Sequence, residues 1–95
     1  MDRTFFTKIY AICEYTITEG SKHTNWDNVM ESLEELKSDA KKTDAGIFKA
    51  LNTLILNIKY YKDKEVNTKY IQLPILVMDL YEKTKKTEAV IYTNK

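Results

Sequence analysis

Cysteine, histidine, proline and glycine are all scarce in this 95-residue chain. The single Cys excludes a disulfide framework, and one Cys with one His is too small a ligand set for a structural zinc site. Two Gly and one Pro are too few for the many tight turns of a β-sandwich. Because 43% of the residues are hydrophobic and 31% are charged, the composition is that of a globular chain. We therefore expect one domain, built mostly from helices.

Long apolar runs and an excess of one charge are also lacking. The longest apolar run, residues 73–78, is far shorter than the roughly 20 residues that cross a bilayer, so we expect no transmembrane segment. The N-terminal residues contain no basic region followed by an apolar one, which argues against a signal peptide. A net charge of +1 argues against a general nucleic-acid binder. Together with the free thiol, these features predict a cytoplasmic protein.

Apolar residues recur at helical spacing in four segments, and this periodicity predicts helices over residues 4–19, 25–42, 44–62 and 74–86. Gly20 is placed to end the first helix, Thr24 to cap the second, and Thr43 or Asp44 to cap the third. The stripes predict a core that includes Trp26, Leu33, Leu51, Leu54, Ile58 and Leu80.

Pro74 determines where the fourth helix is predicted to begin. A proline in a helix interior costs about 3 kcal/mol, whereas the first position of a helix favours it. We therefore start the helix at Pro74, end it near residue 86, and treat residues 87–95 as a tail. The predicted fold is a single-domain, all-α, antiparallel four-helix bundle with a short C-terminal tail.

No combination of residues indicates catalysis or metal binding. His23 lies in a predicted loop without a second His, and Cys13 falls on an apolar helix face, where a buried thiol is expected. The sequence contains no Glu-x-x-His motif of the kind that helical di-metal sites use. We expect no catalytic, metal or cofactor site, no small-molecule substrate and no enzyme activity. The acidic residues of the second segment face away from its apolar stripe and are predicted to be solvated: Glu31, Glu34, Glu35 and Asp39.

Seven tyrosines are more than so small a core can hold, and exposed tyrosine is typical of protein interfaces. Of the adjacent Tyr60 and Tyr61, we expect Tyr61 in the core and Tyr60 at its boundary. The end of the chain combines positive charge with apolar residues, which favours recognition of a partner. In the alternative, residues 90–92 fold back and cover one end of the bundle. The predicted partner-binding residues are Lys83, Lys85, Lys86, Val90, Ile91 and Tyr92.

Residues 47–86 resemble the immunity proteins of the pediocin-like (class IIa) bacteriocins. The resemblance is carried by Ala-Leu-Asn-Thr-Leu at residues 50–54 and by Leu-Pro-Ile-Leu-Val-Met-Asp-Leu-Tyr at residues 73–81. In the family, a proline opens the last helix ahead of a Leu-Tyr pair. The resemblance implies a cytoplasmic four-helix bundle that protects the producer cell at a membrane sugar-transporter receptor. It also implies that specificity lies in the last helix and residues 87–95.

The expected function is therefore non-catalytic protein binding, with bacteriocin immunity as its specific form. A small phage- or virus-encoded inhibitor or accessory protein that binds a host protein is the first alternative. A small nucleic-acid-binding protein, or an oligomeric accessory protein such as a homodimer, is the second.

Overall fold

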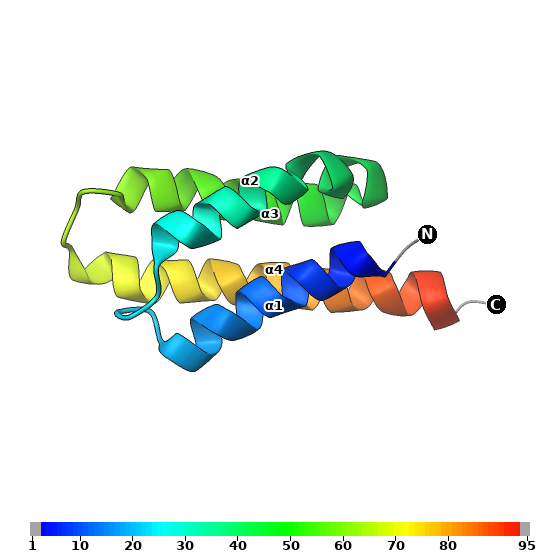
Figure 1. Ribbon diagram of the computed structural model, residues 1–95, viewed down its shortest axis with the longest axis horizontal. Helices are drawn as coiled ribbons and strands as arrows, with labels where there is room; N and C mark the ends of the chain where they lie inside the picture. The colour runs from blue at the N-terminus through cyan, green and yellow to red at the C-terminus, as the bar shows by residue number, and fades with distance from the viewer. Residues whose placement is uncertain (1–2, 94–95) are drawn as a thin grey trace.

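The computed structural model describes residues 3–93, and within them it contains four α-helices and no strand. The helices are α1 (Thr4–Glu19), α2 (Trp26–Thr43), α3 (Ala45–Tyr61) and α4 (Asn67–Thr93). Their directions alternate along a molecule of 47 × 23 × 17 Å, so each helix is antiparallel to the next (Figure 1). The all-α four-helix fold predicted from the sequence is confirmed.

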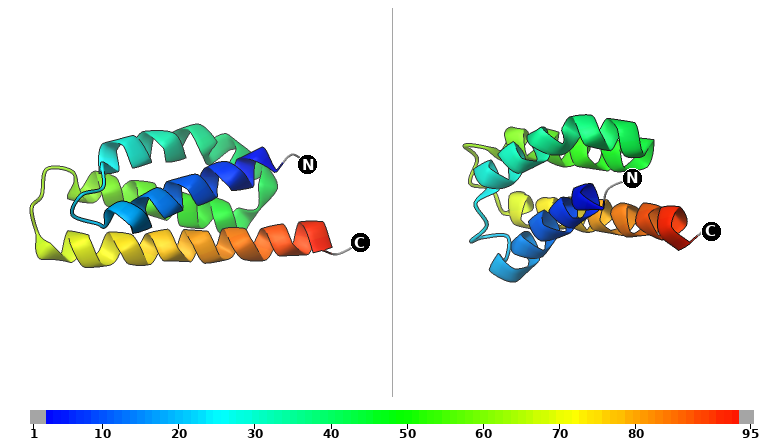
Figure 2. Two further views of the ribbon diagram at one scale, coloured as in Figure 1. Left: turned by 60° about the horizontal axis from the view of Figure 1, so that its bottom comes forward. Right: turned by 45° about the vertical axis from the view of Figure 1, so that its right-hand side comes forward.

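The helices form a ring in which each contacts its neighbours in the chain and α1 contacts α4. The α2–α3 contact is the most extensive, and the α1–α2 contact is the least. Figure 2 shows the result, with α2 and α3 lying together while α1 lies along α4. The side of the bundle between α1 and α2 is therefore its most loosely packed side.

Short polar side chains define where the helices begin. The side-chain oxygens of Asn25 and Asp44 each accept a hydrogen bond from the backbone N–H three residues on, which caps α2 and α3. Thr24 was predicted to cap α2, but its hydroxyl donates to the Gly20 carbonyl at 2.8 Å and closes the α1–α2 loop. Gly20 ends α1 with φ at +83°, a conformation that favours glycine.

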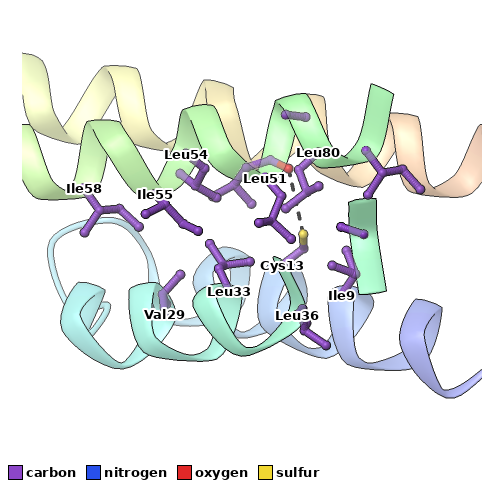
Figure 3. Packing of buried hydrophobic residues seen from close by; sticks show 14 of the residues in the cluster. Ile9, Cys13, Val29, Leu33, Leu36, Leu51, Leu54, Ile55, Ile58 and Leu80 are labelled. Carbon is purple, nitrogen blue, oxygen red and sulfur yellow. Dashed lines mark hydrogen bonds between the residues drawn. The ribbon is translucent and has the colours of Figure 1, made fainter. Parts of the chain in front are cut away.

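The predicted core is confirmed, because all six of its residues are buried: Trp26, Leu33, Leu51, Leu54, Ile58 and Leu80. Most of them appear in Figure 3, where side chains of α1 to α4 meet along the bundle axis. Cys13 is fully buried among them, and its thiol donates a weak hydrogen bond to the Val77 carbonyl at 3.9 Å. Tyr61 is buried, as predicted, whereas Tyr60, which was predicted at the boundary of the core, is 61% exposed.

The fourth helix is longer at both ends than the sequence predicted. It begins at Asn67 rather than at Pro74, which lies inside it, and it continues through the predicted tail to Thr93. Residues 94 and 95 of that tail lie outside the described residues. The helix continues through Pro74 because a stripe of buried residues lies on both sides of the proline. Packing this stripe offsets the loss of the helical hydrogen bond that proline removes. The stripe consists of Leu73, Val77, Leu80 and Thr84.

The last turns of α4 are attached to the first turns of α1. The Arg3 guanidinium lies 4.0 Å from the centroid of the Tyr92 ring, and that ring meets Phe6 edge to face at 6.0 Å. One layer further along, the Tyr10 hydroxyl donates to a Glu88 carboxylate oxygen at 2.7 Å. The segment predicted to be a tail is therefore part of the bundle.

Candidate functional site

Of the three lysines predicted to bind a partner, Lys85 lies on a different side of α4 from Lys83 and Lys86. Lys83 Nζ makes an ion pair with Asp79 at 2.9 Å, and Lys85 Nζ lies 5.2 Å from the centroid of the Tyr81 ring. Lys86 is exposed. Around the helix, residue 85 lies about 160° from residue 83 and about 100° from residue 86, so Lys85 does not share the face of the other two lysines.

The apolar residues of the same predicted site also divide. Ile91 and Tyr92 are partly buried and pack against the core, whereas Val90 is 62% exposed. At spacings of three and four residues, Lys83, Lys86 and Val90 share one outward face. Three of the six predicted residues therefore lie together at the surface, and the apolar pair that motivated the prediction faces inward.

A second exposed surface, which the sequence analysis did not identify, lies on the first half of α4. Ile71, Ile75 and Met78 are 65%, 57% and 42% exposed, and their i, i+4, i+7 spacing places them in one row. We call these three residues the α4 outer stripe. The row exists because six consecutive apolar residues, 73–78, form part of one helix, so apolar side chains point to every side of it.

An apolar pocket of about 230 Å³ adjoins the α4 outer stripe. It lies between the last turns of α1 and the first half of α4, and Ile17, Pro74, Val77 and Met78 form its apolar walls. Ile17 is itself exposed, so it extends the apolar surface from α4 onto α1. The site can accept an apolar side chain, with further apolar contact along the stripe.

The loosely packed side between α1 and α2 is hollowed as well. Two neighbouring hollows of about 310 and 180 Å³ adjoin at Ile12 and Ser32, and together we call them the α1/α2 groove. Carboxylates from α2, Glu35 and Asp39, lie along one edge, and Lys8 from α1 lies along the other. The solvated face predicted for these acids is thus one wall of a groove.

A pocket of about 320 Å³ lies at the end of the bundle that carries the α1–α2 and α3–α4 loops. Lys62 and Lys69 contribute two positive charges, and Asp27, Asp63 and Glu65 contribute three negative charges. Lys69 is already 3.9 Å from Glu65. An excess of one negative charge in a pocket that also contains two lysines does not indicate a ligand of either sign.

The residues weighed for catalysis do not converge on a site. Burial raises the pKa of the Cys13 thiol to about 12, so the thiol stays protonated near neutral pH, and His23 lies exposed in the α1–α2 loop. Lys59 of α3 pairs with Glu34 of α2 at 3.0 Å and lowers the pKa of that carboxyl below its usual value. Among residues 3–93, no three His, Cys, Asp or Glu side chains are grouped so that they could hold a metal ion.

The chain matches no known protein family, no curated protein and no solved structure. In the part of the chain that the structure describes, no helix has both the length and the apolar character needed to cross a membrane.

Proposed function

We propose that this chain is a non-catalytic protein-binding domain and that the α4 outer stripe with its adjoining pocket is the binding surface. The observation that carries the proposal is the row of large apolar side chains left in water at Ile71, Ile75 and Met78. Scattered exposed apolar residues need no explanation, but a contiguous row beside an apolar pocket is typical of an interaction site. Ile17 enlarges the same surface from α1.

The size of the surface suits a short helical segment of a partner. From residue 71 to residue 78 the stripe extends for about 10 Å, or two helical turns. Burying the exposed halves of four such side chains contributes about 1 kcal/mol each. One apolar side chain of the partner would enter the pocket beside Pro74, and neighbouring ones would lie along the stripe.

Bacteriocin immunity is the specific form of this proposal. It is supported by the resemblance of residues 47–86 to the immunity proteins of pediocin-like bacteriocins and by the four-helix class of the fold. This chain departs from the family pattern because Pro74 lies inside the last helix instead of opening it. The partner in this form is the membrane sugar transporter that serves as the bacteriocin receptor, approached from the cytoplasm.

The binding surface is tested by pull-down with matched variants. Immobilised wild-type protein is compared with Ile71→Ser/Ile75→Ser and with Lys86→Ser/Val90→Ser, which alters the outward face near the C-terminal end of α4. Because all four side chains are exposed, both double variants should melt within a few degrees of wild type. We expect a partner that wild type and the second variant retain and that the first variant loses. Retention by the first and loss by the second would refute the α4 outer stripe as the binding surface.

The immunity form is tested in cells. Expression of the chain in a strain that a pediocin-like bacteriocin kills should raise survival, and Ile71→Ser/Ile75→Ser should abolish that protection. A retained transporter in the pull-down supports immunity. A retained soluble polymerase or nuclease contradicts immunity and identifies the chain as an inhibitor of that enzyme.

A further inference from the structure

The α1/α2 groove is long enough to bind another helix. Its lining runs along α2 from Asn28 to Asp39, which is about 16 Å or three helical turns. The helices on its two sides have the least contact of any neighbouring pair in the bundle. The groove therefore lies where the bundle itself provides the least packing.

The floor of the groove is apolar. Val29 and Leu36 present the edges of nearly buried side chains, and Ile12 is partly buried between them. Each of the three lines one or both of the hollows. An occupant must therefore bring apolar side chains to the floor.

The edge of the groove formed by α2 is acidic. Glu31, Glu35 and Asp39 follow one another at four-residue intervals, and Glu35 and Asp39 line the groove directly. Within residues 3–93 none of these three carboxylates makes an ion pair, and neither does Lys8 on the opposite edge. The lining has two carboxylates, Glu35 and Asp39, against the one ammonium of Lys8, and Glu31 adds a further negative charge one turn away on α2, so the groove complements a positively charged occupant.

We propose that the α1/α2 groove binds a basic amphipathic helix of a partner protein. The apolar face of that helix lies on Ile12 and Leu36, and its Lys or Arg side chains pair with Glu35 and Asp39. Carboxylates four residues apart on α2 are about 6 Å apart along the axis, which matches basic residues at i and i+4 on a helix lying alongside. This surface shares no lining residue with the pocket beside the α4 outer stripe, so it is a second site in addition to the proposed function.

Two other occupants fit the charges less well. A second copy of this chain would bring helices of mixed or sparse charge, because α1, α2 and α4 each carry acidic as well as basic side chains. Helix α3 carries only Lys49 and Lys59, and Lys59 is paired with Glu34. An anionic membrane would be repelled by the acidic edge of the groove. A separate protein that carries a basic helix is the occupant whose charge is complementary.

The test uses two designed peptides and the full chain. The first peptide is a 14-residue helix with Leu along one face and Lys at i, i+4 intervals beside it, and the second is its twin with Glu in place of every Lys. Binding is followed by amide chemical-shift titration at low and high salt. We expect the Lys peptide to shift the amides of residues 8–15 and 28–39, with an affinity that falls about tenfold at high salt because these carboxylates are exposed. The Glu twin should not bind.

Matched variants separate the groove from general charge attraction. Glu35→Lys/Asp39→Lys should weaken the Lys peptide at least about tenfold, whereas Glu14→Lys/Glu19→Lys makes the same change in net charge at exposed positions of α1 outside the groove and should stay within about twofold. Equal losses in both variants, equal binding of the Glu twin, or shifts centred on residues 71–78 would overturn the proposal. Ile71→Ser/Ile75→Ser should bind the Lys peptide like wild type, so this proposal and the proposed function can fail separately.

Discussion

Replacing Pro74 with alanine tests how α4 is built. Pro74 is the eighth residue of the helix, beyond the first turn, so its missing N–H leaves the Tyr70 carbonyl without its helical hydrogen bond. Alanine restores that donor, and in a helix interior it is about 3 kcal/mol more favourable than proline. The exchange should therefore stabilise the protein, although proline is usually regarded as the stiffer residue.

Two smaller effects oppose this gain. The proline ring is partly buried against the apolar pocket, and losing that contact costs about 1 kcal/mol. Alanine also gives the unfolded chain more freedom, which costs about 0.4–1 kcal/mol. The net effect of Pro74→Ala is an increase of about 1–2 kcal/mol in the free energy of unfolding. For a domain of this size, that corresponds to a rise of about 5–10 °C in melting temperature.

Thermal and urea unfolding followed by far-UV circular dichroism measure the change. Ile75→Ala is the matched control, because its side chain is exposed on the same turn and its loss should alter stability by no more than about 0.5 kcal/mol. A melting temperature for Pro74→Ala that equals or falls below that of wild type would refute the reasoning. That result would place Pro74 at the first position of a helix, where proline is favoured.

Three further predictions concern the core and the helix ends. Leu54→Ala should cost about 2–5 kcal/mol in urea unfolding because Leu54 is fully buried, and a cost below about 1 kcal/mol would place it at the surface. Removing residues 87–95 should lower the melting temperature by about 10 °C or more, since Ile91 and Tyr92 pack on the core; an unchanged value would show that these turns do not support the fold. The raised pKa of Cys13, about 12, means that only the unfolded chain loses the thiol proton between about pH 9 and 12. Stability should therefore fall there by up to about 1.4 kcal/mol per pH unit relative to Cys13→Ala, and parallel pH curves would contradict the burial of the thiol.

The first three helices and the core could be predicted because periodicity reports burial directly, as at Leu33 and Leu54. The fourth helix could not, for two physical reasons. At its start, tertiary packing of Leu73 overrides the local preference against proline. Further along, the buried stripe includes Thr84, a polar residue that would be expected at the surface from the sequence alone. Its hydroxyl donates to the Leu80 carbonyl at 2.7 Å, and this local bond lets a threonine occupy a core position.

The candidate sites were less accessible to sequence reasoning than the fold. Charge and apolar content drew attention to the C-terminal turns, but Tyr92 uses its ring within the bundle. The α4 outer stripe could have been found from the apolar run 73–78, once that run was placed inside a helix that includes Ile71. The α1/α2 groove could not have been found from the sequence, because the packing of the whole bundle determines which pair of helices has the least contact. The sequence around Glu35 is also the same whether its side chain lies beside a groove or on a flat surface.

The contact between α1 and α4 also bears on the order in which the bundle assembles. Helices α2, α3 and α4 follow one another through short connections, while the Tyr10–Glu88 bond joins residues 78 positions apart. Closing so long a loop is entropically costly, so we expect α1 to dock last during folding and to detach first during partial opening. Cys13 lies on α1 and is sealed in the core while α1 is docked. Its rate of alkylation therefore measures how often the first helix leaves an otherwise intact three-helix remainder.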